Sequence, residues 1–257
     1  MNNKPLILVT NDDGIFAKGI RTLIDCVKDF GEVLVLAPDK PQSAMGHAVT
    51  ILEPLFIRKI SSSENYREYS CNGTPADCVK LAYRAILNRK PDLIVSGINH
   101  GANSSLNVLY SGTMAAVIEG AMSDIPAVGF SLCDYMPDAN FDHCIDAVKS
   151  IVANVLEEKL PPRVVLNVNI PAASCGKIKG VKVTRQADAY WDERFDKRTD
   201  PHGREYYWLT GDFINIDEDD DNDLVALDNS YVSIVPVQLD LTAHETIKEI
   251  RKWKFEY

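Results

Sequence analysis

The fold is decided by one short stretch, Pro5-Leu-Ile-Leu-Val-Thr-Asn-Asp-Asp-Gly14. Its apolar run, Leu6 to Val9, has the length of a buried strand in a parallel sheet, and a segment with helical periodicity follows it. Asp12 and Asp13 then stand beyond the carboxyl end of that strand, where open α/β sheets bind their ligands. Gly14 allows the chain to turn, so that both carboxylates can face one target. Two ionised carboxylates this close repel each other, and a divalent cation is the simplest way to keep both charged.

Composition indicates a soluble globular protein with one substantial α/β domain or two small ones. The 257 residues are 46% hydrophobic and 25% charged, which is ordinary for that class. We see no signal-peptide pattern and no membrane-spanning apolar run, and therefore expect no membrane partner. The six cysteines are scattered without a Cys-x-x-Cys pair, which favours reduced thiols in a cytoplasmic protein. A net charge of -10 argues against nucleic acid as the main partner.

Further apolar segments extend the first strand into a mostly parallel sheet. A second strand, Glu32 to Ala37, follows one helical segment, and the two strands with their helix make a βαβ unit. More strands are predicted at Leu55 to Ile60, Leu93 to Val95, Pro126 to Leu132 and Arg163 to Ile170. Helices are predicted to begin near Ile20, Thr74, Ser111 and Phe141, and a turn is predicted at Ser61 to Ser63. This alternation is typical of an α/β protein whose sheet is flanked by helices.

The character of the sequence changes near Ala172. We therefore divide the chain into a core, residues 1–171, and a strand-rich extension, residues 172–257, that holds most of the Trp and Tyr. In the extension, strands are predicted at Val181 to Thr184, around Tyr206 to Leu209 and at Tyr231 to Val235, before a final helix over His244 to Lys254. The acidic run from Asp217 to Asp223 is interpreted as a solvated loop, with metal binding as the less favoured alternative.

Three polar loops follow strands at the same edge of the predicted sheet: Asn11 to Gly14, Pro41 to Ala44 and Ser96 to Asn99. Their side chains can converge there, because the carboxyl ends of parallel strands meet at one edge. Together they offer a set of oxygen ligands from Asp12, Asp13, Ser43 and Asn99. Such a set suits Mg²⁺ or Mn²⁺ rather than zinc. The alternative for the Asp pair taken alone is a helix cap beside a solvated carboxylate.

A helix start adds a candidate anion site at Ser111-Gly-Thr113. Free backbone N–H groups and two hydroxyls at a helix N-terminus are a ready phosphate site, although Ser111 alone is more simply a cap. The stretch Asn72 to Pro75 also has two interpretations, a substrate contact or a turn with a helix cap. His47 follows a site loop and could protonate a leaving alcohol, but a structural or solvated His is the simpler interpretation.

Several other chemistries lack their residues. The chain has no Gly-x-x-x-x-Gly-Lys-Ser/Thr, Gly-x-Gly-x-x-Gly, Gly-x-Ser-x-Gly or His-Glu-x-x-His. A phosphatase with an aspartyl-phosphate intermediate would need Asp-x-Asp, and Gly14 stands two positions after Asp12. A receiver-type signalling domain needs a phosphate-accepting Asp at the end of a central strand, where Val95-Ser-Gly97 has no carboxylate.

Taken together and in order, the loops resemble the SurE family, the stationary-phase survival proteins with metal-dependent 5′/3′-nucleotidase activity. The motifs that carry the resemblance are Val9-Thr-Asn-Asp-Asp-Gly-Ile15, Ala37-Pro38 with Gln42-Ser43, Asn72-Gly-Thr-Pro-Ala-Asp77, Ser96-Gly-Ile-Asn-His-Gly-Ala-Asn103 and Tyr110-Ser-Gly-Thr113. Two later stretches are similar to the C-terminal region of the family, Tyr231 to Pro236 and Leu239 to His244. The resemblance implies a Rossmann-like fold with a C-terminal extension of strands.

The resemblance also implies roles for individual residues. One divalent metal cation per subunit, Mg²⁺ or Mn²⁺, would be held by Asp12, Asp13, Ser43 and Asn99. The phosphate would lie among Asn103, Ser111, Gly112 and Thr113, and the catalytic set would be Asp12, Asp13, Asn99, Asn103 and Ser111. Members of the family are dimers or tetramers that exchange C-terminal segments, which makes the extension an expected oligomerisation arm. The alternative is that the extension folds onto its own domain. Asp240 and His244 would tie that arm to its neighbour, and Glu218 to Leu224 departs from the Gly-rich pattern common in the family.

We therefore expect a metal-dependent phosphomonoesterase of the acid-phosphatase-like type. Its substrates would be nucleoside 5′-monophosphates, with 3′-monophosphates as a further class, and direct attack by water would release nucleoside and phosphate. The alternative is a regulatory module that binds metal and nucleotide without turnover. Asp12→Asn should abolish catalysis in the first case and only weaken ligand binding in the second.

Overall fold

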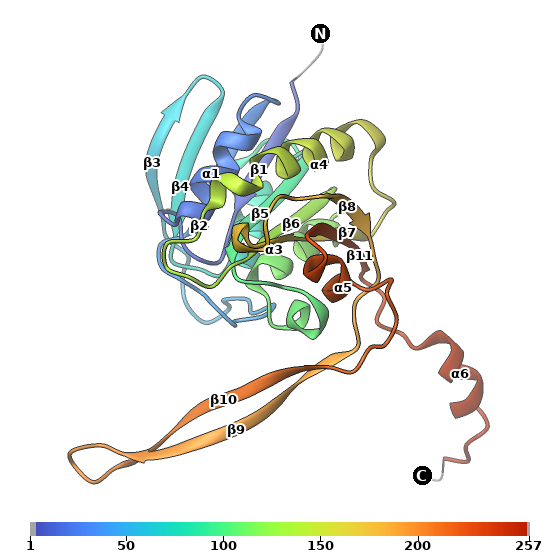
Figure 1. The fold of residues 1–257 in the computed structure, drawn as a ribbon. Helices are drawn as coiled ribbons and strands as arrows, with labels where there is room; N and C mark the ends of the chain where they lie inside the picture. Colours follow the sequence, from blue (N-terminus) through green and yellow to red (C-terminus); the bar gives the residue numbers. More distant parts are fainter. Residues whose placement is uncertain (1–3, 256–257) are drawn as a thin grey trace.

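Residues 4–255 are described by the computed structural model, in which helices cover a large mixed sheet and two segments protrude from it (Figure 1). The strands are Leu6–Thr10 (β1), Glu32–Pro38 (β2), Ile57–Ser63 (β3), Tyr66–Cys71 (β4), Leu93–His100 (β5), Ala127–Cys133 (β6), Val164–Pro171 (β7), Gly180–Val183 (β8), Ala189–Thr199 (β9), Glu205–Asn215 (β10) and Tyr231–Gln238 (β11). The α-helices are Lys18–Val27 (α1), Pro75–Leu81 (α2), Gly112–Ala121 (α3), Ile145–Glu158 (α4), Asp223–Asp228 (α5) and His244–Ile250 (α6). Short turns of π- or 3₁₀-helix are Ala82–Ile86 (η1), Ser105–Leu109 (η2), Phe141–Cys144 (η3) and Ala173–Cys175 (η4).

The main sheet has nine strands in the order β3-β4-β2-β1-β5-β6-β7-β11-β8. The strands from β4 to β7 in this order are parallel, whereas β3 pairs with β4 and β11 pairs with β7 in antiparallel fashion. The predicted α/β class with a mostly parallel sheet is therefore confirmed. The extension after residue 171 supplies β8 and β11 to this sheet, and the division of the chain at that point stays a prediction.

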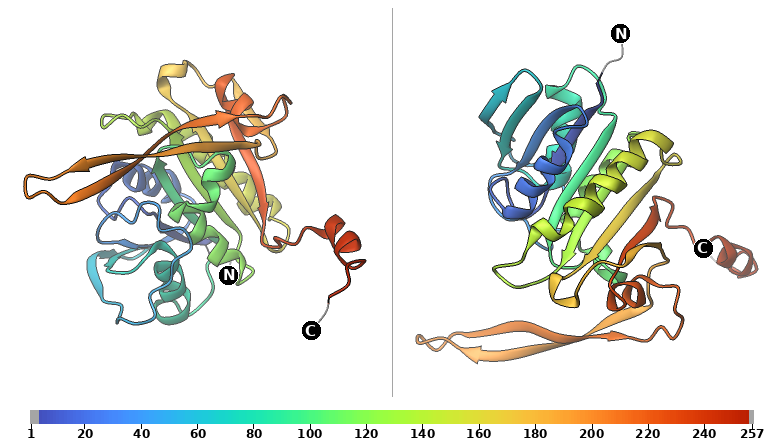
Figure 2. Two further views of the ribbon diagram at one scale, coloured as in Figure 1. Left: turned by 90° about the horizontal axis from the view of Figure 1, so that it is seen from below. Right: turned by 45° about the horizontal axis from the view of Figure 1, so that its top comes forward.

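Each face of the sheet has its own hydrophobic core. Alternate residues of β1 point to opposite faces, so that Ile7 and Val9 pack with α1 and α4, whereas Leu6 and Leu8 pack with α2 and α3. Helices thus cover both faces, and Figure 2 shows α1 and α4 side by side on one of them. This double coverage explains why the first strand is a continuous apolar run, since all five of its residues are buried.

Two segments of the extension leave the body of the molecule. Strands β9 and β10 form a long antiparallel hairpin, in which Ala189 alone is buried, and α6 has no buried residue. Both segments project away from the sheet in Figures 1 and 2. Across residues 4–255, no helix combines the length and the apolar character that crossing a membrane would require.

Several predicted boundaries need correction. The turn predicted at Ser61 to Ser63 is wrong, because these residues end β3, an edge strand whose side chains are all exposed, so polar residues fit it well. Strand β10 is much longer than the predicted stretch around Tyr206 to Leu209, and its partner β9 was not predicted. The helix α6 ends at Ile250 rather than at Lys254. The short helix α5 was missed because it begins inside the acidic run.

Candidate active site

The predicted site residues meet at the edge of the sheet where β1, β2 and β5 end. A cleft of about 320 Å³ is lined by Asp12, Asp13, Ser43, Asn99, Asn103 and Ser111, among others. Gly112 and Thr113 lie directly behind it, in the first turn of α3. The convergence expected from three loops on one sheet edge is therefore confirmed in its geometry, whereas the role of each residue stays a prediction.

Asp12 is the most constrained carboxylate of the cleft. Its side chain is buried, and its Oδ1 accepts a hydrogen bond from the Thr113 hydroxyl at 2.6 Å. A Cβ atom on Gly112 would lie 2.8 Å from the Cβ of Asp12, so only glycine lets the start of α3 approach the carboxylate this closely. Burial, aided by the charge of Asp13, raises the pKa of Asp12 to about 6, although the bond from Thr113 opposes this rise.

Asp13 and Asn99 are held by the loops around them. The Oδ2 of Asp13 accepts a hydrogen bond from the backbone N–H of His100 at 3.0 Å, and burial raises the pKa of this carboxyl as well. The side-chain amide of Asn99 donates to the carbonyl of Gly101 at 2.8 Å, so its amide group is oriented by the loop, and its role as a metal ligand stays a prediction. The turn predicted at Gly14 is present, with φ of +98°.

The donor chemistry of the cleft fits a hard divalent cation. The four predicted ligands offer two carboxylates, one hydroxyl and one amide oxygen, which is an all-oxygen set. Within residues 4–255 the lining of the cleft has no Lys or Arg, and its one basic side chain is His100, whose charge acts against the rise that burial causes in the pKa of Asp13. The same part of the chain has no group of three or more His, Cys, Asp and Glu that could hold a metal, as expected for a set with only two acidic ligands.

Asn103 is held by a buried network of amides that the sequence analysis missed. Its backbone N–H donates to Asn169 Oδ1 and its side-chain amide donates to Ser131 Oγ, both at 2.8 Å. Asn167 in turn donates to the carbonyl of Asn103 at 2.8 Å, and Asn169 donates to Asn167 at 3.2 Å. The sequence signal for this network was the presence of Asn167 and Asn169 at alternate positions of the otherwise apolar strand β7. All four residues are buried, so Asn103 has little freedom to move.

Two of the predicted helix starts, Thr74 and Ser111, are helix caps. Ser111 Oγ accepts the backbone N–H of Met114 at 3.0 Å, which confirms the cap interpretation, and Ser111 also lines the cleft. Thr74 and Asp77 form a capping box at the start of α2. Residues 72–75 are not part of the cleft lining, so the cap interpretation holds for that stretch.

His47 lies outside the cleft. Its Nε2 is 3.2 Å from Glu119 Oε2, and the same buried carboxylate accepts a bond from Lys80 at 2.6 Å. The structural interpretation of His47 is therefore confirmed, and protonation of a leaving group by this residue gains no support. Asp240 and His244 contact each other at 2.8 Å within one chain, and their expected role in tying the arm to a neighbour stays a prediction.

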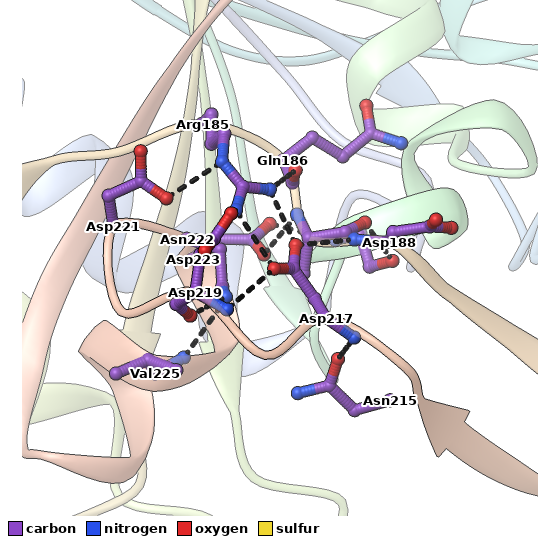
Figure 3. Close-up of polar contacts among 12 residues, drawn as sticks. Arg185, Gln186, Asp188, Asn215, Asp217, Asp219, Asp221, Asn222, Asp223 and Val225 are labelled. Carbon is purple, nitrogen blue, oxygen red and sulfur yellow. Dashed lines mark hydrogen bonds and ion pairs between the residues drawn. The ribbon is translucent and has the colours of Figure 1, made fainter.

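The acidic run is anchored rather than uniformly solvated. The Arg185 guanidinium contacts Asp217 at 2.8 Å, Asp219 at 3.0 Å and Asp221 at 2.7 Å (Figure 3). Its hydrogen bonds lower the pKa of Asp217. The solvated-loop interpretation is wrong at both ends of the run, because the Asp217 side chain is 5% exposed and Asp223 is fully buried.

Comparison with known proteins identifies the family. The family model described as Survival protein SurE matches residues 7–193. Two relatives named 5′-nucleotidase SurE are 60% identical in Christiangramia forsetii and 58% identical in Flavobacterium johnsoniae, with 97% and 98% of each chain aligned, respectively. The crystal structure of the SurE protein from Aquifex aeolicus matches with a TM-score of 0.82 at 40% identity, covering 96% of this chain and 98% of that one. These matches extend over most of the present chain, which therefore belongs to the SurE family.

Proposed function

We propose that the chain is a metal-dependent nucleotidase that hydrolyses nucleoside 5′-monophosphates to nucleoside and phosphate, with 3′-monophosphates as a second substrate class. One observation carries the proposal: Asp12, which is buried, and Asp13, which is partly buried, lie in one cleft with the N-terminus of α3. The names of the relatives from Christiangramia forsetii and Flavobacterium johnsoniae support the substrate class.

In this proposal the chain divides the work between two sets of residues. Asp12, Asp13, Ser43 and Asn99 would hold one Mg²⁺ or Mn²⁺. When bound, such a cation polarises a phosphate oxygen and lowers the pKa of a coordinated water. The backbone N–H groups of the first turn of α3 and the hydroxyl of Ser111 would bind the phosphate oxygens. Asn103, fixed by its amide network, would support the charge that develops as the ester bond breaks.

Direct attack by water fits this arrangement best. Ser111 carries the hydroxyl at the N-cap of α3, where the phosphate is proposed to bind, and its Oγ is engaged as the cap of that helix. No His or carboxylate within residues 4–255 is hydrogen-bonded to that hydroxyl as a general base would be. Trapping a phosphorylated Ser111 during turnover would contradict direct attack.

The test is phosphate release from a panel of 5′- and 3′-nucleoside monophosphates. Chelator-stripped protein would be assayed with Mg²⁺ or Mn²⁺ added back, beside Asp13→Asn and the matched control Asp25→Asn on the exposed end of α1. We expect metal-dependent release that Asp13→Asn abolishes and Asp25→Asn leaves unchanged. Binding of nucleotide and metal by the folded protein without any release would instead favour the regulatory module.

We also propose that the hairpin and α6 associate with another copy of this chain, in a homodimer or homotetramer. Large apolar side chains are exposed on the hairpin and on either side of α6, among them Phe195 at 68%, Leu241 at 88% and Trp253 at 63%. Isolated two-stranded hairpins are marginal in water, so an extended one with apolar side chains gains stability from a partner. Light scattering after size-exclusion chromatography should give a mass of two or four times 28.6 kDa.

A further inference from the structure

The cleft continues beyond the predicted metal ligands onto an aromatic wall. Trp191, Tyr110 and Tyr135 line the same cleft as Asp12 and Asp13, together with Asn107. Trp191 reaches the cleft from the root of the hairpin, which passes the edge of the sheet where β1 and β5 end (Figures 1 and 2). Apolar rings and an uncharged amide at this end of the cleft suit a flat, uncharged group rather than a second phosphate.

The indole of Trp191 is fixed although much of it faces solvent. Its Nε1–H donates to Asn107 Oδ1 at 2.8 Å, and its ring lies 5.2 Å from the ring of Phe213 across the hairpin. Trp191 nevertheless remains 43% exposed. A large aromatic ring that is held at its edge and by a neighbouring ring, yet left open to a cleft, is preorganised for stacking.

The root of the hairpin is itself bound to the phosphate side of the site. The buried carboxylate of Asp223 accepts the backbone N–H of Ser105 at 2.8 Å and that of Ala187 at 3.0 Å. The hydroxyl of Ser105 donates to the carbonyl of Ala187 at 2.8 Å, which closes the link. Trp191 is therefore held in a fixed position relative to η2, the segment between Asn103 and Ser111.

We propose that Trp191, positioned by Asn107, is the stacking platform for the base of the bound nucleotide. This inference rests on the proposed nucleotidase function, since it assigns the base of the same substrate whose phosphate meets α3. Every nucleobase has a π-face, so a stacking platform of this kind accepts purines and pyrimidines alike, with purines favoured by their larger ring area. Trp191 is a binding residue in this account, and Asn107 is a positioning residue.

The test compares AMP with ribose 5-phosphate, which carries the phosphate and sugar but no base. We expect Trp191→Ala to raise KM for AMP about tenfold, or about 1.4 kcal/mol, with kcat changed less than twofold. The same variant should leave KM for ribose 5-phosphate unchanged. Trp191→Phe keeps an aromatic face and the packing with Phe213, and should recover most of the loss. Tyr190→Ala is the matched control, because Tyr190 is 45% exposed on the same strand and does not line the cleft.

Two results would overturn the platform. One is an unchanged KM for AMP in Trp191→Ala, and the other is an equal rise for AMP and ribose 5-phosphate, which would indicate general damage to the site. If the unaltered chain hydrolyses neither compound and no other nucleotide of the panel, the nucleotidase proposal fails, and the platform is tested separately by Trp191 fluorescence in a Trp208→Phe, Trp253→Phe background. Quenching by adenosine but not by ribose would support it, and quenching by neither would contradict it.

Discussion

The parallel core and the protruding hairpin are both built from β-strands, but they are stabilised differently. Every residue of β1 is buried, whereas Ala189 is the single buried residue of β9 and β10 together. In the core, burial of side chains on both faces offsets the loss of chain entropy. In the hairpin, the strands have their own ladder of hydrogen bonds and little else. The difference teaches that the core is stabilised by burial on both faces of its sheet, whereas the hairpin depends on the contacts between its own two strands and at its root.

The two regions meet at the candidate site. The link from Asp223 to Ser105 and Ala187 joins the hairpin root to η2, and Trp191 lines the cleft beside the residues of the core. The site therefore draws its predicted metal ligands and two rings of its aromatic wall, Tyr110 and Tyr135, from the core, and the third ring, Trp191, from the hairpin. The two regions can be separated by mutations that act on one and spare the other.

The largest difference should appear in the cost of removing a phenylalanine. Phe130 on β6 is fully buried, and Phe130→Ala should lower the free energy of unfolding by about 3–5 kcal/mol at any protein concentration. Phe195 in the hairpin is 68% exposed, and Phe195→Ala should change the free energy of unfolding by less than about 0.5 kcal/mol in dilute protein. Urea unfolding at two protein concentrations measures both. A large loss for Phe195→Ala in fully dissociated protein would contradict the comparison.

A smaller effect is expected at the amide network behind the site. Asn169→Ala leaves the backbone N–H of Asn103 without its acceptor in a buried position, which should cost about 1–3 kcal/mol of stability. It should also lower kcat more than it changes KM, because Asn103 loses its fixed position. The control is Asn154→Ala, whose side chain is exposed on α4 and donates to the carbonyl of Ser150. Unchanged kcat in Asn169→Ala would show that the network serves stability alone.

Much of the core could be predicted from sequence because its rules are local. An apolar run followed by polar residues predicts a buried strand and its carboxyl end, and parallel strands bring such ends together, which placed Asp12, Ser43 and Asn99 in one cleft. The turn at Gly14 could also be predicted locally, because a turn with positive φ requires only that glycine stand at that position.

The rest of the site depends on contacts that no local pattern specifies. The bond from Ser105 to Asp223 joins residues 118 positions apart, and neither residue carries a signal of its own beyond a polar side chain. Strand β9 mixes charged and aromatic residues because no face of it is buried in the core, so it lacks the alternation that predicts a strand. Trp191 therefore could not be placed in the cleft before the hairpin was seen.

The smallest expected effect is a pH-dependent change in stability, and it separates two His–carboxylate pairs. One is His47–Glu119 in the core, and the other is His244–Asp240 beside α6. In the core, burial alone would raise the pKa of Glu119, but hydrogen bonds from His47 and Lys80 outweigh it and lower this pKa below its ordinary value of 4.5. Stability from this pair is thus present above that value and is lost as the pH falls through the lowered pKa. In the arm, hydrogen bonds from Thr242 and then His244 lower the pKa of Asp240, which is exposed.

Glu119→Gln should therefore lower the free energy of unfolding by about 1 kcal/mol at pH 7, and the difference should shrink as the pH falls below 4.5 and through the lowered pKa of Glu119. The value is modest because Lys80 is 41% exposed and water screens its charge. Asp240→Asn should leave unfolding unchanged at both pH values, since α6 buries no residue and can fray without opening the core. Urea midpoints between pH 7 and pH 3.5 measure both variants. A loss of stability in Glu119→Gln that is the same at all pH values would mean that the shape of the carboxylate matters rather than its charge. A loss of stability in Asp240→Asn would mean that the segment around α6 unfolds together with the core.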